Sequence, residues 1–153
     1  MAQIAKIEVQ AEIKSSTEKL YGFFKNQMGR LVQMFPQNFK SCEILGGGNA
    51  LTSGTIMSWK YDLGSGPMSV KLKVEDADEE NKSISFVVLD GDLLKLYNTF
   101  KPKIHIFKDS NGNAQIKWSI EFDKANQNAP SPSSYLDLAI KVSKGLDAYL
   151  YNN

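Results

Sequence analysis

The sequence has almost none of the residues that build disulfide bonds or zinc sites. Cys42 is the only cysteine and His105 the only histidine in 153 residues, so one chain cannot form a disulfide or a Cys/His zinc site. A nucleophile such as Cys42 or Ser119 also lacks a histidine placed by the sequence to activate it, unless the fold brings His105 close. We therefore expect no metal, no cofactor and no triad-type hydrolase.

The sequence also lacks an excess of positive or negative charge and has no long apolar run. The 18 Lys and Arg residues are scattered among 17 Asp and Glu residues, for a formal net charge of +1, so the basic surface typical of a nucleic-acid binder is absent. The N-terminal residues alternate polar and apolar side chains, and no apolar run of about 18 residues follows. We expect a cytoplasmic protein with no nucleic-acid partner and no stable membrane association.

What the sequence does have fits one globular domain over residues 1–153. Hydrophobic residues make up 42% and aromatic residues 10% of the chain. A domain of about 150 residues buries roughly 68–70% of the surface of its unfolded chain, so its core can hold the fold without disulfides or a structural metal. We expect this domain to be a monomer or a weak dimer.

Period-two alternation and helix-capping residues organise the first third of the chain. Residues 7–13 alternate apolar and polar side chains, which is typical of a half-buried strand. Hydroxyl residues at 15–17 supply helix caps before an apolar stretch that breaks near Gly29 and stops at Pro36, which indicates two short helices. A brief strand and a glycine-rich loop follow over 42–49.

Five further strands and a long helix account for the rest of the chain. Consecutive strands joined by turn-rich segments indicate an antiparallel meander. The helix begins after Pro132, and its apolar residues recur at i, i+3 and i+4 from Tyr135 to Tyr149. The chain is therefore predicted to be α+β, with its helices segregated from one curved antiparallel sheet. The strand signals cover 55–61, 68–75, 83–89, 100–108 and 115–124.

Short segments along the whole chain carry a resemblance to a known family. They are Gly54-Thr55-Ile56 with Trp59 and Tyr61, Glu79 to Ser83, Leu89 to Asp92, Tyr97 with Phe100-Lys101, Lys117-Trp118-Ser119 with Glu121-Phe122, and Pro132 with Tyr135-Leu136. In their order and spacing the sequence resembles the major latex protein family, a plant branch of the birch pollen allergen, or pathogenesis-related, superfamily. The resemblance implies the START-like helix-grip fold, in which a seven-stranded curved antiparallel sheet grips a long C-terminal helix and two short helices follow the first strand.

The resemblance also implies a large hydrophobic cavity between the sheet and the helix. Small-molecule pockets usually measure roughly 300–1,000 Å³. The glycine-rich segment 46–54 has no following Gly-Lys-Ser/Thr, so we expect a flexible cavity rim there and no nucleotide site. Alternation places Met57, Trp59, Tyr61, Met68, Val70, Leu72, Phe86, Val88, Phe100 and Ile104 on the cavity wall. The resemblance adds Phe23, Leu31, Phe35, Phe39 and Leu93 at the mouth, and Tyr135, Leu138, Ala139 and Val142 from the helix.

The last strand gives two conflicting predictions. Period-two alternation places Ile116, Trp118 and Ile120 on the buried side, whereas alignment of Lys117-Trp118-Ser119 with the family turns Lys117 and Ser119 into the cavity. A β-bulge would be needed to satisfy both. We follow the family alignment and expect Lys117 and Ser119 to contact the ligand.

An apolar cavity predicts a small hydrophobic ligand, and the resemblance implies an intracellular plant carrier for lipids, hormones or specialised metabolites, with a link to defence. The alternative is a cofactor-independent cyclase or isomerase that holds a reactive alkaloid or iridoid intermediate in the same cavity, as norcoclaurine synthase does within the superfamily. Lys117 would then be the acid or base, with Tyr61 and Tyr97 as hydrogen-bond donors. A third class is a signalling module whose glycine-rich rim closes over a ligand.

Overall fold

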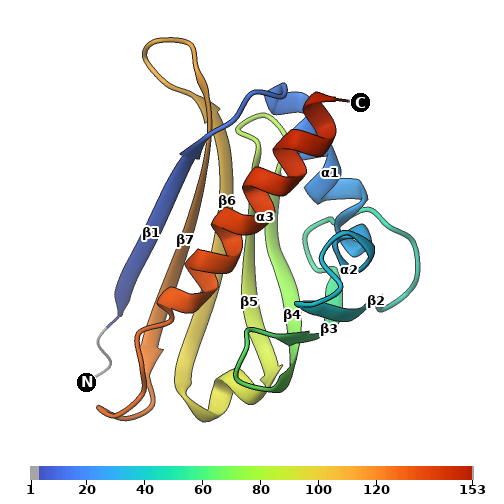
Figure 1. Ribbon diagram of the computed structural model, residues 1–153. Coiled ribbons are helices and arrows are strands. Elements are labelled where there is room, and N and C mark those ends of the chain that lie inside the picture. Colours follow the sequence, from blue (N-terminus) through green and yellow to red (C-terminus); the bar gives the residue numbers. More distant parts are fainter. Residues whose placement is uncertain (1–3, 153) are drawn as a thin grey trace.

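The chain forms one seven-stranded antiparallel sheet with a long helix lying across one face (Figure 1). The structure is a computed structural model, and it describes residues 4–152. The strands lie in the order β1-β7-β6-β5-β4-β3-β2, so β2 to β7 form a meander and β1 pairs with β7. Their bounds are Ala5–Glu12 (β1), Phe39–Ile44 (β2), Ile56–Asp62 (β3), Pro67–Asp78 (β4), Ser83–Gly91 (β5), Tyr97–Lys108 (β6) and Ala114–Lys124 (β7).

The three α-helices lie before and after the meander, as the sequence predicts. Ser16 caps the first helix, because its hydroxyl accepts a hydrogen bond from the Lys19 backbone N–H at 3.1 Å. The interruption predicted near Gly29 is a short 3-10 helix, η1, between the two short α-helices. The bounds are Thr17–Asn26 (α1), Met28–Arg30 (η1), Leu31–Met34 (α2), Asp92–Lys95 (η2, between β5 and β6) and Ser133–Tyr151 (α3). The predicted α+β helix-grip fold is confirmed.

Two irregularities between β4 and β5 help the sheet curve around α3. The register of this strand pair shifts between Lys71 and Leu72 and again between Val74 and Asp76. Such bulges bend a strand and increase its local twist. The inner, concave face therefore faces α3, which crosses it diagonally in Figure 1.

The hydrophobic core is continuous with α1 at one end of the sheet. Leu20 and Phe24 of α1 are fully buried, and the Phe24 ring meets the Trp118 ring of β7 edge-on, with centroids 5.5 Å apart. Leu146, in the second half of α3, is equally buried. Because α1 contacts both β6 and α3, side chains fill the space at this end.

A buried carboxylate fastens the second half of α3 to the segment between β1 and α1. Asp147 accepts hydrogen bonds from the backbone N–H groups of Lys14 and Ser15, at 2.9 and 2.8 Å, and from Ser15 Oγ at 2.6 Å. Hydrogen bonds to a charged acceptor are roughly twice as strong as neutral ones. This contact fixes the position of α3 over the sheet.

Replacing the Asp147 carboxylate by an amide tests this contact. In Asp147→Asn the amide oxygen can keep the position of Oδ1, but the NH₂ group takes the position of Oδ2 and faces the Lys14 N–H, and the acceptor becomes neutral. The free energy of unfolding should therefore fall by about 1.5 kcal/mol. Urea denaturation followed by circular dichroism measures the change. Asp137→Asn, at an exposed position of the same helix, is the control. An equal loss in both variants would contradict the assigned role of Asp147.

Candidate functional site

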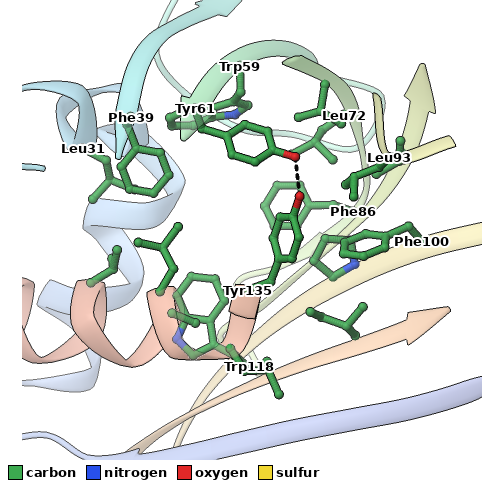
Figure 2. A pocket seen from close by; sticks show the side chains of 18 of the residues that line it. Leu31, Phe39, Trp59, Tyr61, Leu72, Phe86, Leu93, Phe100, Trp118 and Tyr135 are labelled. Carbon is green, nitrogen blue, oxygen red and sulfur yellow. Dashed lines mark hydrogen bonds between the residues drawn. The ribbon is translucent and has the colours of Figure 1, made fainter. Parts of the chain in front are cut away.

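A cavity of about 150 Å³ lies between the inner face of the sheet and the N-terminal half of α3 (Figure 2). Residues of β2 to β7 line it, together with residues of the short helices and α3. An apolar cavity of this size has room for about one aromatic ring. The lining residues are Met28, Leu31, Phe39, Trp59, Tyr61, Val70, Leu72, Phe86, Val88, Leu93, Phe100, Pro102, Trp118, Ser119, Ile120, Tyr135, Leu136, Leu138, Ala139 and Val142.

The cavity is smaller than the large pocket expected from the sequence. Ligand sites usually begin at roughly 300 Å³, about twice the volume present here. Tyr61 of β3 and Tyr135 of α3 extend toward each other across this space, and their hydroxyl oxygens lie 2.5 Å apart in the hydrogen bond drawn in Figure 2. This bond connects the helix to the sheet and occupies volume that a ligand could use.

Burial keeps both tyrosines of this pair protonated. Loss of hydration raises the pKa of Tyr61, and the same effect, strengthened by the nearby Tyr61 hydroxyl, strongly raises the pKa of Tyr135. The Tyr135 ring also packs on Phe100, with centroids 5.3 Å apart. Near pH 7 the two hydroxyls are therefore neutral hydrogen-bond donors and neither is a base. They are the only ionisable side chains in the described lining.

Most residues that the sequence places on the cavity wall are found in the lining. The strand residues among them, apart from Ser119, share the inner face of the sheet, and the helix residues share the side of α3 that faces it. That they contact a ligand stays a prediction. These residues are Leu31, Phe39, Trp59, Tyr61, Val70, Leu72, Phe86, Val88, Leu93, Phe100, Ser119, Tyr135, Leu138, Ala139 and Val142.

Phe23 and Phe35, expected at the cavity mouth, do not line the cavity. Phe35 packs on α3 at Gly145, where a Cβ atom would lie only 2.8 Å from the Phe35 ring. Phe23 is buried beside a separate surface groove, which Arg30 and Tyr149 also line. Both phenylalanines instead help the short helices pack on α3, an arrangement that residue spacing does not reveal.

Three strand residues expected on the wall also lie outside the lining. Met57 and Ile104 do turn to the inner face, but they are 0% and 1% exposed and belong to the filled part of the core. Met68 is half-buried, and its sulfur lies 3.9 Å from the Tyr135 hydroxyl oxygen. It contacts the tyrosine pair without lining the cavity. The inner face is thus longer than the cavity that α3 leaves over it.

In β7 the structure follows period-two alternation. Trp118 lines the cavity, whereas Lys117 pairs with His105 on the outer face and places its Nζ 6.0 Å from the centre of the Phe107 ring. The expectation that Lys117 faces the cavity is therefore wrong, because β7 pairs with both neighbours in continuous register around Lys117, and the register shift between β6 and β7 lies at the far end, at Tyr97 and Thr99. Ser119 is in the lining, although alternation turns its side chain outward.

Several lining residues are absent from the sequence-based set although simple patterns contain them. Pro102 alternates with Phe100 and Ile104 along β6. Trp118 and Ile120 follow the alternation of β7. Helical spacing from Ala139 gives Leu136. The full set is Met28, Pro102, Trp118, Ile120 and Leu136.

The two tryptophans of the chain both line the cavity but differ in their hydrogen bonding. Trp118 Nε1 donates a hydrogen bond to Ser143 Oγ of α3 at 2.7 Å. Trp59 is 5% exposed, and its buried Nε1 has no acceptor among residues 4–152. A buried donor without an acceptor costs about 1–3 kcal/mol. The protein therefore leaves one polar group of the cavity wall unsatisfied.

Only one of the three residues considered for an enzyme lines the cavity. Tyr61 does so, while Lys117 lies on the outer face. Tyr97 is 1% exposed, and its hydroxyl donates to the Pro130 carbonyl oxygen at 2.5 Å. Burial raises the pKa of Tyr97 as well. Its hydrogen bond holds the segment that leads into α3, which is a structural role.

Cys42 lies partly buried in β2, where its thiol is less ionised than an exposed one. It pairs with Trp59 across β2 and β3, and burial raises its pKa to about 11. Compared with an ordinary thiol, the thiolate fraction at pH 8 falls about 100-fold, while each thiolate becomes roughly tenfold more nucleophilic. We expect iodoacetamide to alkylate the folded chain about tenfold more slowly than the urea-unfolded chain, as measured by mass spectrometry.

Because folding raises the pKa of the Cys42 thiol, the free energy of unfolding should decrease at alkaline pH. The thiol has a higher pKa in the folded chain than in the unfolded chain. Its contribution to the free energy of unfolding is therefore fully present below about pH 9 and is lost as the pH rises toward 11. Cys42→Ser removes this dependence and serves as the control. Equal alkylation rates in the folded and unfolded chains would show that the thiol is not shielded.

The glycine-rich segment 46–54, expected at the rim, does not line this cavity within the described residues. Its Leu51 is buried and donates its backbone N–H to the Lys25 carbonyl of α1 at 2.7 Å.

Within residues 4–152, no group of three or more His, Cys, Asp or Glu side chains could hold a metal ion. No helix in that range is long and apolar enough to span a membrane.

Sequence comparison relates the chain to plant proteins along nearly its full length. It is 33% identical to MLP-like protein 423 of Arabidopsis thaliana over 146 residues, which cover 94% of this chain and 92% of that protein. It is 29% identical to Major latex protein 146 of Papaver somniferum over 148 residues, covering 96% and 91%. The chain spans about half of MLP-like protein 34 of Arabidopsis thaliana, to which it is 32% identical.

Structure comparison gives the same relationship. Ginseng major latex-like protein 151 from Panax ginseng superposes with a TM-score of 0.87 at 25% identity, over 95% of this chain and 97% of that one. Norcoclaurine synthase from Thalictrum flavum superposes with a TM-score of 0.67 at 20% identity, over 99% and 91%, which shows a common fold. Residues 2–153 match the pathogenesis-related protein Bet v 1 family. The chain therefore belongs to the pathogenesis-related protein Bet v 1 family.

Proposed function

We propose that this protein binds small, mainly apolar molecules in the cavity between α3 and the sheet and carries them unchanged. The observation that carries the proposal is the lining, where aliphatic and aromatic side chains converge on a space that they leave unfilled. Protein interiors are close packed, and an empty cavity of this volume costs about 3–4 kcal/mol. A bound guest recovers much of that cost.

The size of the cavity bears on the size of the ligand. A guest of one aromatic ring buries about 150–250 Å² and gains about 4–6 kcal/mol at ~25 cal/mol per Å². Loss of translational and rotational freedom costs at least about 4 kcal/mol. One ring alone therefore binds weakly, and tight binding requires a larger guest that separates α3 from the sheet. Such a guest would break the hydrogen bond between Tyr61 and Tyr135.

The lining supports a carrier better than it supports a cyclase or isomerase. General acid–base catalysis uses a group whose pKa lies near the working pH. Tyr61 and Tyr135, the ionisable side chains of the described lining, are both held protonated by burial. An enzyme using this cavity would have to act through hydrogen bonds from these two hydroxyls. Binding without chemistry therefore fits the residues best.

Ligand displacement and native mass spectrometry test the carrier function. Titration with an environment-sensitive apolar dye should reach about one dye per chain, and hydrophobic metabolites should displace it. Protein isolated from plant tissue should show a bound molecule in the native mass spectrum. His105→Ala, on the outer face, is the control and should bind the dye unchanged. If no apolar probe binds, the carrier function is wrong.

A further inference from the structure

The contrast between the two tryptophans indicates what kind of ligand the cavity accepts. Both indoles line the same cavity, from β3 and from β7, and the fold supplies an acceptor for Trp118 through Ser143, 2.7 Å away. It supplies none for the buried Nε1 of Trp59 among the described residues. Because buried donors are almost always paired, the missing acceptor is a group that the ligand can bring.

The tyrosine pair holds a second underused donor. Two hydroxyls carry two hydrogens, and the bond between Tyr61 and Tyr135 uses one of them. The neighbour left for the other is the sulfur of Met68, 3.9 Å from the Tyr135 oxygen, and a thioether is a weak acceptor. The wall therefore has a surplus of donors over acceptors.

The absence of charged side chains from the described lining indicates that the acceptor group of the ligand is neutral. The described lining contains no Lys, Arg or His side chain, so a carboxylate or phosphate would lose its hydration without gaining a counter-charge. An ammonium group would bring donors to a site that already has too many. A neutral oxygen acceptor, as in a ketone, ester or lactone, satisfies the donors without burying a charge.

Building on the carrier function, we propose that the ligand is an apolar molecule with a neutral carbonyl oxygen that accepts a hydrogen bond from Trp59 Nε1. Trp59 and Tyr61 lie near each other on the inner face of β3, and Tyr61 reaches toward Tyr135 (Figure 2). Neighbouring side chains cover the Nε1 atom in this structure. The cavity holds about one ring, so a guest with a ring and a carbonyl substituent, such as acetophenone, already has to separate the two tyrosines. This separation uncovers Nε1 and frees a hydroxyl, which donates a second hydrogen bond to the same oxygen.

Three small probes of similar shape test this proposal in the wild-type chain. Acetophenone has the carbonyl, ethylbenzene lacks it, and benzoate replaces it with a charge. With only two tryptophans, a ¹⁵N-labelled sample gives two indole N–H signals that can be followed during titration. We expect acetophenone to bind about fivefold more tightly than ethylbenzene, and benzoate to bind more weakly than acetophenone. Acetophenone should shift the Trp59 signal downfield and the Trp118 signal much less.

A pair of matched variants separates the hydrogen bond from ring packing. Trp59→Phe keeps an aromatic ring but removes the unpaired N–H, so acetophenone should lose its advantage over ethylbenzene. Trp118→Phe also alters the lining, so the affinities for both probes should change together. Because the N–H that it removes is already bonded to Ser143, the ratio of the two affinities should stay as in the wild type. Equal affinities for acetophenone and ethylbenzene in the wild type, or an advantage that survives in Trp59→Phe, would overturn this inference and leave the carrier function intact. If none of the three probes binds, the carrier function fails as well.

Discussion

Ala139→Phe should abolish the binding of ring-sized apolar ligands without unfolding the protein. Ala139 is 6% exposed and faces the cavity from α3. The substitution attaches a benzene ring to a Cβ atom that borders about 150 Å³ of space, and a cavity of that size holds about one such ring. The new side chain would therefore occupy the place of the ligand. Affinity for an apolar dye should fall about 100-fold or more.

The stability of the variant separates a filled cavity from a damaged fold. Filling the space adds buried apolar surface, while any overpacking costs about 1–3 kcal/mol, so the two effects largely cancel in the free energy of unfolding. Lys144→Phe places the same side chain on the exposed side of α3 and should leave dye binding unchanged. Dye binding by a folded Ala139→Phe variant at wild-type affinity would show that ligands bind elsewhere.

The strands were predictable because their signals are local. In β7, every second residue from Ile116 to Phe122 is apolar, and hairpin connections leave few alternatives for pairing. The fourth strand is the instructive exception. Its sequence signal ends at Glu75, whereas β4 continues to Asp78 because the bulge after Val74 breaks the alternation without ending the pairing.

The cavity could be predicted only in part, because its extent depends on where α3 lies along the sheet. Phe100 and Ile104 share the inner face of β6, yet only Phe100 lines the cavity. No local pattern distinguishes them. The bond between Tyr61 and Tyr135, which crosses this space, joins residues 74 positions apart, so no local pattern reveals it.

The error at Lys117 has a different origin. Alternation along β7 correctly turned Trp118 inward and Lys117 outward, and the burial cost of a lysine agrees with that choice. Alignment with the family suggested the opposite register. At 29–33% identity to relatives, the local physical pattern is the better guide to which face of this strand points inward.

Gly91→Ala should destabilise the fold more than any other substitution considered. Gly91 ends β5 beside η2 and has a φ of 117°, a region that residues with a Cβ atom rarely adopt. A Cβ atom there would also collide with the Ser69 carbonyl oxygen and lie 2.8 Å from Val70 Cα. Both contacts are with backbone of β4, which cannot rotate away. Strain and displacement together should lower the free energy of unfolding by about 3–5 kcal/mol.

Gly112→Ala is the matched control, because it separates backbone strain from the close approach. Gly112 has a φ of 83°, but a Cβ atom there would meet nothing within 4 Å. Its loss of stability should be about 1–2 kcal/mol, the cost of the left-handed conformation alone. Urea denaturation of both variants measures the difference. Since Val70 and the neighbouring Leu93 line the cavity, Gly91→Ala should also weaken dye binding, whereas Gly112→Ala should not. Equal destabilisation by the two substitutions would mean that β4 can yield at Ser69, and that this strand pair does not hold the cavity wall in place.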